Sequence, residues 1–206
     1  MVEETQEIGA FFDRVASNRV APASGSVVAL AGAGGAALVE KAAIHTLENR
    51  LGADSEKEMI RDVRQSVRNH RSILLSLAAS DAEAVDALFA GASDETDQTV
   101  LERATGIPLS IADSCSSILE DSLGIITAVD GAVAPDLYSG LWIVYSATLA
   151  AVRTVETNLE LIEDSSLRSQ FEARKNTVLQ DLATNVGELE ADSSIDFEVS
   201  ADRSPE

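Results

Sequence analysis

Two aspartates, Asp81 and Asp136, have a side chain that can move protons and offset positive charge. Asp81 lies in a Ser-x-x-Glu pattern and Asp136 follows Pro135, so each is expected in the first turn of a helix. An acid at that position also stabilises the helix dipole and needs no further role. Both aspartates are therefore candidates for chemistry, and each has a purely structural alternative.

A loop-to-helix junction is the third candidate. Pro22 and Gly25 interrupt the helical pattern just before a long Ala-rich segment. Free backbone N–H groups and the helix dipole make such a helix start attractive to a carboxylate or a phosphate, although Ser26 could simply cap an ordinary helix. Asn158, among apolar neighbours, is a fourth candidate that could contact a ligand or form a hydrogen bond between helices.

Other reactive residue types give weaker signals. His45 and His70 have no second His or Cys at the spacing of a metal site, so no metal is predicted. Cys115 lies on an apolar stripe, where packing in the core is a better interpretation than nucleophilic chemistry. The sequence contains no Gly-Lys-Ser/Thr phosphate-binding loop and no dinucleotide fingerprint.

The composition favours an all-α protein with one hydrophobic core. Of 206 residues, 45% are hydrophobic and only 4% aromatic, which suits closely packed helices better than a sheet. The glycines at 32, 34 and 35 predict close approach of another backbone or of a flat ligand. We expect one domain over residues 1–187 and an acidic disordered tail over residues 188–206.

Apolar periodicity, caps and breakers predict six to eight helices in an antiparallel bundle. The expected helices cover residues 8–15, 27–51, 55 onward, 99–123, 135–163 and 166–186. Pro108 is expected to kink or break the fourth of these, because proline removes a backbone donor. Ser80 either starts a new helix or lies within the third.

The net charge of −20, from 35 acidic and 15 basic residues, limits the kinds of molecule that the protein is expected to bind. A surface this acidic repels phosphate backbones and anionic membranes, so neither nucleic acid nor membrane is an expected partner. The acid either serves solubility in a salt-rich cytoplasm, as in halophiles, or forms a local patch for a cationic partner. Because the acid is spread along the chain and lysine is scarce, the halophilic interpretation is favoured.

The expected location is the cytoplasm. The single cysteine fits a reducing interior, and the acidic N-terminus lacks the basic region of a signal peptide. The longest apolar stretch, residues 27–39, is too short to span a bilayer.

Taken in order, several short motifs resemble the formiminotransferase-cyclodeaminase C-terminal family, which includes formiminotetrahydrofolate cyclodeaminase and methenyltetrahydrofolate cyclohydrolase. The family has Pro-Gly-Gly-Gly-Ser before an Ala-rich helix, an Asp-Ala-x-Ala-Phe segment and a Ser-Asp pair. The matching segments here are Ile8–Ser17, Pro22–Ala33, Asp81–Asp86, Ile107–Leu109, Pro135–Leu137 and Asn158–Ile162. The match covers about residues 7 to 180.

The resemblance implies a homodimeric helical bundle that binds a tetrahydrofolate derivative as substrate and needs no metal. It implies hydrolysis of 5,10-methenyltetrahydrofolate to 10-formyltetrahydrofolate as the first choice, because the chain contains no formiminotransferase segment. The alternatives are formiminotetrahydrofolate cyclodeamination with ammonia release, or a divergent non-catalytic regulator, since Ala23 and Ser24 replace two of the family's loop glycines.

The resemblance also implies roles for individual residues. Asp136 and Asp81 would be catalytic, with Asp136 facing the glycine loop across a pocket for the pterin ring. The substrate-binding residues would be Pro22, Ser24, Gly25, Ser26 and Asn158.

Overall fold

The computed structural model describes residues 8–49, 54–90 and 98–193. These residues form six α-helices and one short 3-10 helix, with no strand among them, which confirms the predicted all-α class. The elements in chain order are α1 (Ile8–Val15), α2 (Ser24–Asn49), α3 (Asp54–Ala90), α4 (Gln98–Leu123), η1 (Ile126–Ala128), α5 (Ala134–Leu159) and α6 (Ser165–Ser193).

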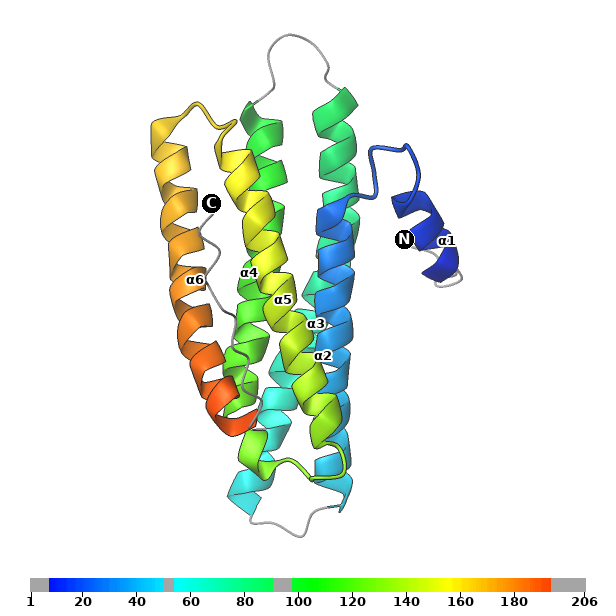
Figure 1. The fold of residues 1–206 in the computed structure, drawn as a ribbon, viewed down its shortest axis with the longest axis vertical. Coiled ribbons are helices and arrows are strands. Elements are labelled where there is room, and N and C mark those ends of the chain that lie inside the picture. Colours follow the sequence, from blue (N-terminus) through cyan, green and yellow to red (C-terminus); the bar gives the residue numbers. More distant parts are fainter. Residues whose placement is uncertain (1–7, 50–53, 91–97, 194–206) are drawn as a thin grey trace, which may run out of the picture.

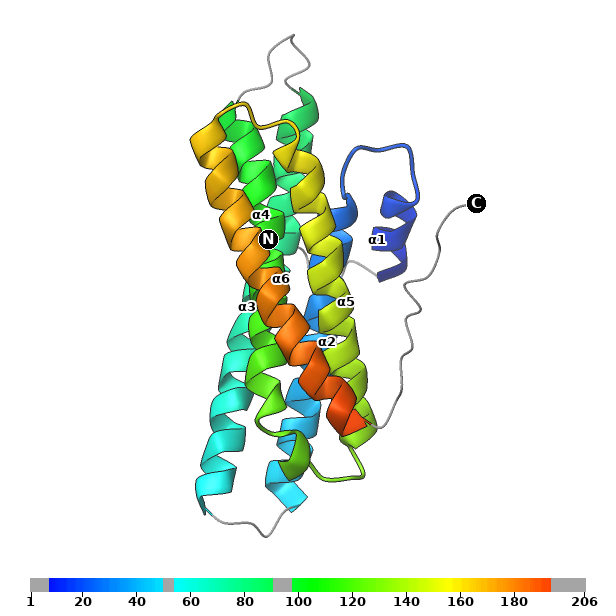
Figure 2. The ribbon, with the colours of Figure 1, turned by 60° about the vertical axis from the view of Figure 1, so that its left-hand side comes forward.

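Helices α2 to α5 form an antiparallel four-helix bundle (Figure 1). Each helix contacts the next, and α5 closes the ring against α2. Helix α6 covers the outside of the pair α4 and α5, as the turned view in Figure 2 shows. Helix α1 lies off the bundle beside the first turns of α2 and has no buried residue. The start of α2 and the end of α3 therefore share one end of the molecule.

The small residues of α2 let two helices cross closely. A Cβ atom on Gly35 would lie 2.8 Å from the carbonyl oxygen of Gly140 in α5, and one on Gly140 would lie 2.7 Å from that of Gly35. Neither distance is possible for a real side chain, so both positions require glycine. At Gly35, the predicted close approach is therefore that of the α5 backbone and not that of a flat ligand.

The structure decides one boundary that the sequence left open and corrects two predicted ones. Helix α3 runs without interruption through Ser80, so Asp81 lies inside a helix and not in a first turn. Helix α4 continues through Pro108 without a break. Helix α6 extends to Ser193 through the start of the predicted tail, because buried Leu189 anchors its last turns. The remaining part of that tail lies outside the described residues.

Helix α2 is the one described helix that is long and apolar enough to cross a membrane, because it extends well beyond the apolar stretch of residues 27–39. Core helices of globular proteins pass the same test. Here α2 packs against α3 and α5 and buries most of its alanine and glycine residues, whereas Ala31, Gly34 and Ala37 are exposed.

Candidate functional site

The start of α2 is held by a buried carboxyl group from α3. The backbone N–H of Ser26 donates to Oδ2 of Asp81 at 2.7 Å, and Ser26 Oγ lies 2.9 Å from the same oxygen. Asp81 is only 4% exposed. Because the first N–H groups of a helix have no partner within the helix, the carboxyl group of α3 caps α2 in place of a local residue.

The Ser26 hydroxyl links Asp81 to a second acceptor. Its Oγ also lies 2.9 Å from the carbonyl oxygen of Ala78. A hydroxyl carries one proton, so it donates either to Asp81 or to Ala78 at any moment. If it donates to Ala78, a protonated Asp81 can donate to Oγ, which makes the pair able to hold a proton in two arrangements.

Burial raises the pKa of Asp81 above its ordinary value, and the hydrogen bonds from Ser26 offset part of that rise. Loss of hydration disfavours the charged form, whereas donors to a carboxylate favour it. A carboxyl group whose pKa moves toward neutrality is better matched to proton transfer at physiological pH. Asp81 is therefore suited to act as a general acid or base.

Gly25 makes this contact possible. A Cβ atom at this position would lie 2.1 Å from Oδ1 of Asp81, so any side chain would push the carboxyl group away. Ser24 is exposed and already helical, and Ala23 precedes it in the loop. The one retained glycine is thus the one that touches Asp81.

A pocket of about 860 Å³ opens beside this carboxyl group. It lies between the start of α2, the last turns of α3 and the last turns of α5, and four predicted site residues line it: Ser24, Gly25, Asp81 and Asn158. Asn158 Nδ2 donates to the carbonyl oxygen of Ala104 at 2.9 Å, which ties α5 to α4 at the pocket wall. The structure therefore brings together residues from three distant segments.

The other two predicted binding residues face a neighbouring hollow. Pro22 and Ser26 line a space of about 540 Å³ on the other side of the start of α2. Arg19 borders both hollows. The predicted set thus surrounds one helix start but is divided between two spaces.

The sequence predicted that Asp136 faces the loop before α2. Within a single subunit this prediction is wrong. It lies in the first turn of α5, where Lys41 Nζ approaches its Oδ2 at 2.7 Å. Lys41 follows Ser26 by fifteen residues on α2, which is roughly 22 Å at the rise of an α-helix. Since α5 is antiparallel to α2, its start lies at the opposite end of the bundle (Figure 1).

Sequence reasoning missed one face of α5 as part of the site. Arg153, Thr154 and Thr157 line the same pocket as Asn158. Their spacing of one, four and five residues before Asn158 places all of them on one side of a helix. This helical spacing from Asn158 is the signal in the sequence that indicates these three residues.

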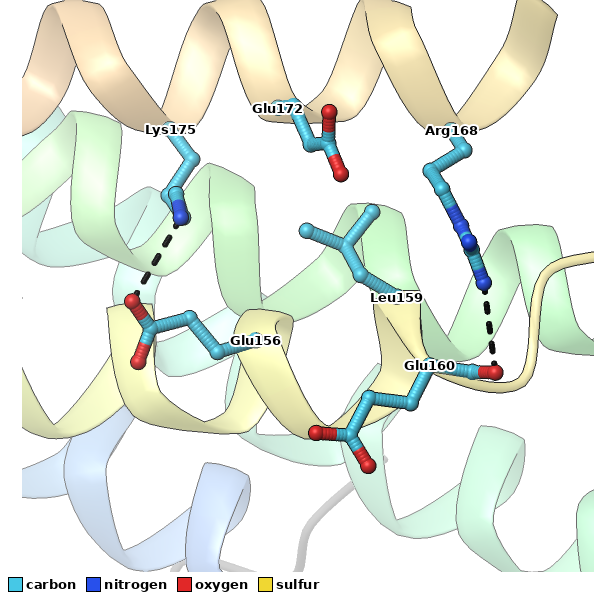
Figure 3. Close-up of a pocket in the computed structure, with 6 residues that line it drawn as sticks. All are labelled: Glu156, Leu159, Glu160, Arg168, Glu172 and Lys175. Atoms are coloured by element: carbon cyan, nitrogen blue, oxygen red, sulfur yellow. Dashed lines mark hydrogen bonds and ion pairs between the residues drawn. The ribbon is translucent and has the colours of Figure 1, made fainter. Parts of the chain in front are cut away.

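A second charged hollow, of about 450 Å³, lies between α5 and α6 (Figure 3). Lys175 Nζ is 3.4 Å from Oε1 of Glu156, and Arg168 Nη2 donates to the carbonyl oxygen of Glu160 at 3.3 Å. Leu159 lies between these two pairs. Because its cations already bind protein oxygens, this hollow is a weaker candidate than the pocket at Asp81.

The weaker candidates from the sequence do not contribute to this pocket. Cys115 is buried against Gly32, and burial raises the pKa of its thiol to about 12, which confirms the interpretation as core packing. In the described ranges, no cluster of three or more His, Cys, Asp or Glu side chains could hold a metal ion.

The fold and the pocket define a helical-bundle protein that positions the buried carboxyl group of Asp81, whose pKa is raised, beside a cavity large enough for a small organic ligand. The sequence profile of the family described as formiminotransferase-cyclodeaminase matches residues 7–177. The chain therefore belongs to the formiminotransferase-cyclodeaminase family, as its motifs suggested.

A solved structure supports the same fold. The crystal structure of formiminotetrahydrofolate cyclodeaminase from Thermotoga maritima is similar to this chain with a TM-score of 0.86 and 19% sequence identity. The similarity covers 93% of this chain and 97% of the other. No curated protein sequence matches significantly.

Proposed function

We propose that the protein is a folate one-carbon enzyme that converts 5-formiminotetrahydrofolate to 5,10-methenyltetrahydrofolate and ammonia. The observation that carries the proposal is the buried Asp81 carboxyl group, held on the start of α2 at the wall of a ligand-sized pocket. The family to which the chain belongs, and the name of the similar solved structure, support this choice of substrate.

The reaction needs a group that accepts and returns a proton. Nitrogen N10 of the folate attacks the formimino carbon, which forms a tetrahedral carbon bonded to three nitrogens. Asp81 accepts the proton from N10 and passes it to the former formimino nitrogen. A second proton, taken up from the solvent, lets that nitrogen leave as ammonia and leaves the bridge with its positive charge. The product carries a positive charge on its bridge, which the ionised carboxylate then stabilises.

Hydrolysis of 5,10-methenyltetrahydrofolate, the first choice from the sequence, is the second candidate. It would use the same carboxyl group as a base toward water, which adds to the bridging carbon. Exposed side chains at the rim, including Ser24 and Arg153, leave the pocket open to water, which supports this candidate.

We also propose that the chain forms a homodimer through the outer face of α2 and α5. Ile143 and Leu149 on α5 are 37% and 38% exposed, and Ile143 lines an apolar hollow of about 380 Å³ together with Val27 and Ala31 of α2. A two-fold axis perpendicular to the bundle would bring Asp136 of the partner subunit toward the start of α2. The predicted catalytic role of Asp136 depends on this dimer. Light scattering tests whether the dimer forms, and cross-linking tests which faces meet.

The assay compares both substrates in low salt and in about 2 M KCl, because the spread of acidic residues also supports adaptation to a salt-rich cytoplasm. Ammonia release from the formimino substrate with slower decay of methenyltetrahydrofolate supports cyclodeamination. The reverse ranking supports hydrolysis. Rates equal to those of buffer for both substrates would contradict an enzymatic role.

A further inference from the structure

Pro108 creates a vacant hydrogen-bond acceptor beside the pocket. In an α-helix each backbone N–H donates to the carbonyl oxygen four residues earlier. Proline has no N–H, so Pro108, inside α4, leaves the carbonyl oxygen of Ala104 without its helical donor. Ala104 is buried, and an unsatisfied carbonyl there would cost stability.

The side chain of Asn158 supplies the missing donor. Its Nδ2 lies 2.9 Å from the Ala104 carbonyl oxygen, 54 residues away in sequence. This contact replaces the hydrogen bond that α4 loses at the proline, and α4 continues through Pro108. It also settles which end of the amide faces the helix, because only the NH₂ end can donate to a carbonyl.

The other end of the amide is then available to the pocket. The Oδ1 atom of Asn158 accepts no hydrogen bond from the described parts of the chain, and it is not sealed from solvent. Both Asn158 and Ala104 line the pocket that contains Asp81. With Nδ2 fixed against α4, the amide presents an acceptor rather than a donor to a ligand.

We propose that Pro108 is a positioning residue for substrate binding: it frees the Ala104 carbonyl to hold the Asn158 amide, so that Oδ1 accepts an N–H group of the substrate. The inference rests on the proposed function only for the identity of that substrate. The reduced pterin ring of a tetrahydrofolate carries several N–H donors and so matches an acceptor at this place.

The first test needs no ligand. In the free protein, NMR signals of the Asn158 side-chain NH₂, assigned by their loss in Asn158→Ala, report its hydrogen bond to Ala104. Pro108→Ala restores a competing backbone N–H, so these signals should shift and their protons should exchange faster with water. Pro135→Ala is the matched control, because Pro135 lies in the first turn of α5, where no helical carbonyl loses a donor. Unchanged Asn158 signals in Pro108→Ala would overturn the proposal.

The second test measures binding of 5-formyltetrahydrofolate by calorimetry. Pro108→Ala and Asn158→Ala should each raise the Kd by about threefold to tenfold, the size expected for one neutral hydrogen bond. The double variant should bind no more weakly than Asn158→Ala alone, because both changes remove the same contact. In the assay, the KM should rise while the kcat changes by less than about twofold.

These outcomes separate the two proposals. Additive losses in the double variant, or a loss in Pro108→Ala that persists without Asn158, would contradict the positioning role. If the wild-type protein binds no folate, the proposed function fails, whereas the NMR comparison still decides whether Pro108 orients Asn158.

Discussion

The two ends of α2 each hold an aspartate from another helix, yet the two carboxyl groups differ in burial and in their partners. At the first end, Asp81 is buried, accepts hydrogen bonds from Ser26 and has a raised pKa. At the other end, Asp136 is 32% exposed and forms an ion pair with Lys41, which is 52% exposed. Burial, and not the presence of an acid near a helix start, distinguishes a candidate proton carrier from a surface ion pair.

The comparison also shows that an acidic residue can cap a helix other than its own. Asp136 stabilises its own helix, as its position after Pro135 predicts. Asp81 lies within α3, and the helix start that it caps is that of α2. Only the neighbouring helix gives Asp81 its partner.

Replacing Asp81 with asparagine should give the largest effect on activity. Asparagine keeps the size and can still accept hydrogen bonds from Ser26, but it cannot carry a proton. We expect a loss of about 10²- to 10⁴-fold in kcat, the range of general acid–base catalysis. The test measures steady-state rates with both folate substrates, and circular dichroism confirms that the variant is folded. Activity within a factor of ten of the wild type would remove Asp81 from the mechanism.

Replacing Gly25 with alanine should disrupt the same end of α2 through sterics. The added methyl group would displace the Asp81 carboxyl group, so we expect about 1–3 kcal/mol of destabilisation together with loss of activity. Urea unfolding measures the change.

The control for this variant is Gly187→Ala in α6, where a methyl group would meet nothing within 4 Å. That exposed change should stabilise the helix by up to about 1 kcal/mol. Equal effects of the two substitutions would show that the contact at Gly25 does not matter.

The raised pKa of Asp81 predicts a dependence of stability on pH. Its protonated form is favoured by the folded state, so its stabilising contribution is complete below the ordinary value of 3.8 and is lost as pH rises through the raised pKa. Relative to Asp81→Asn, the wild type should therefore lose thermal stability as the pH rises from about 4 through the raised pKa of Asp81. Calorimetric Tm values of both proteins over this range test the sign. A widening advantage of the wild type at neutral pH would contradict it.

The ion pair at the far end should give the smallest effect. Exposed pairs contribute about 0–1 kcal/mol and are screened by salt, so Asp136→Asn and Lys41→Met should each change the free energy of unfolding by no more than that. Unless the proposed dimer carries Asp136 into the site of the partner subunit, we expect at most a tenfold loss of activity in Asp136→Asn. A loss as large as that of Asp81→Asn would reverse the ranking of the two aspartates and would favour a site shared between subunits.

Local sequence predicted much of the fold because helices obey local rules. The apolar stripe of residues 8–15 and the proline before Asp136 both predicted helices that the structure contains. Local rules failed at Pro108, where the donor that keeps α4 continuous comes from Asn158 on another helix. They also placed the end of the last helix too early, because Leu189 is anchored by distant neighbours.

The sequence by itself determined the helical class, the family and the residue types of the site, since periodicity, composition and ordered motifs are properties of neighbouring residues. Only the tertiary structure decided that Asp81 meets Ser26 across 55 residues and that Asp136 lies at the opposite end of α2. The reason is physical: burial and hydrogen-bond partners depend on which helices pack together, and packing joins segments that no local pattern connects.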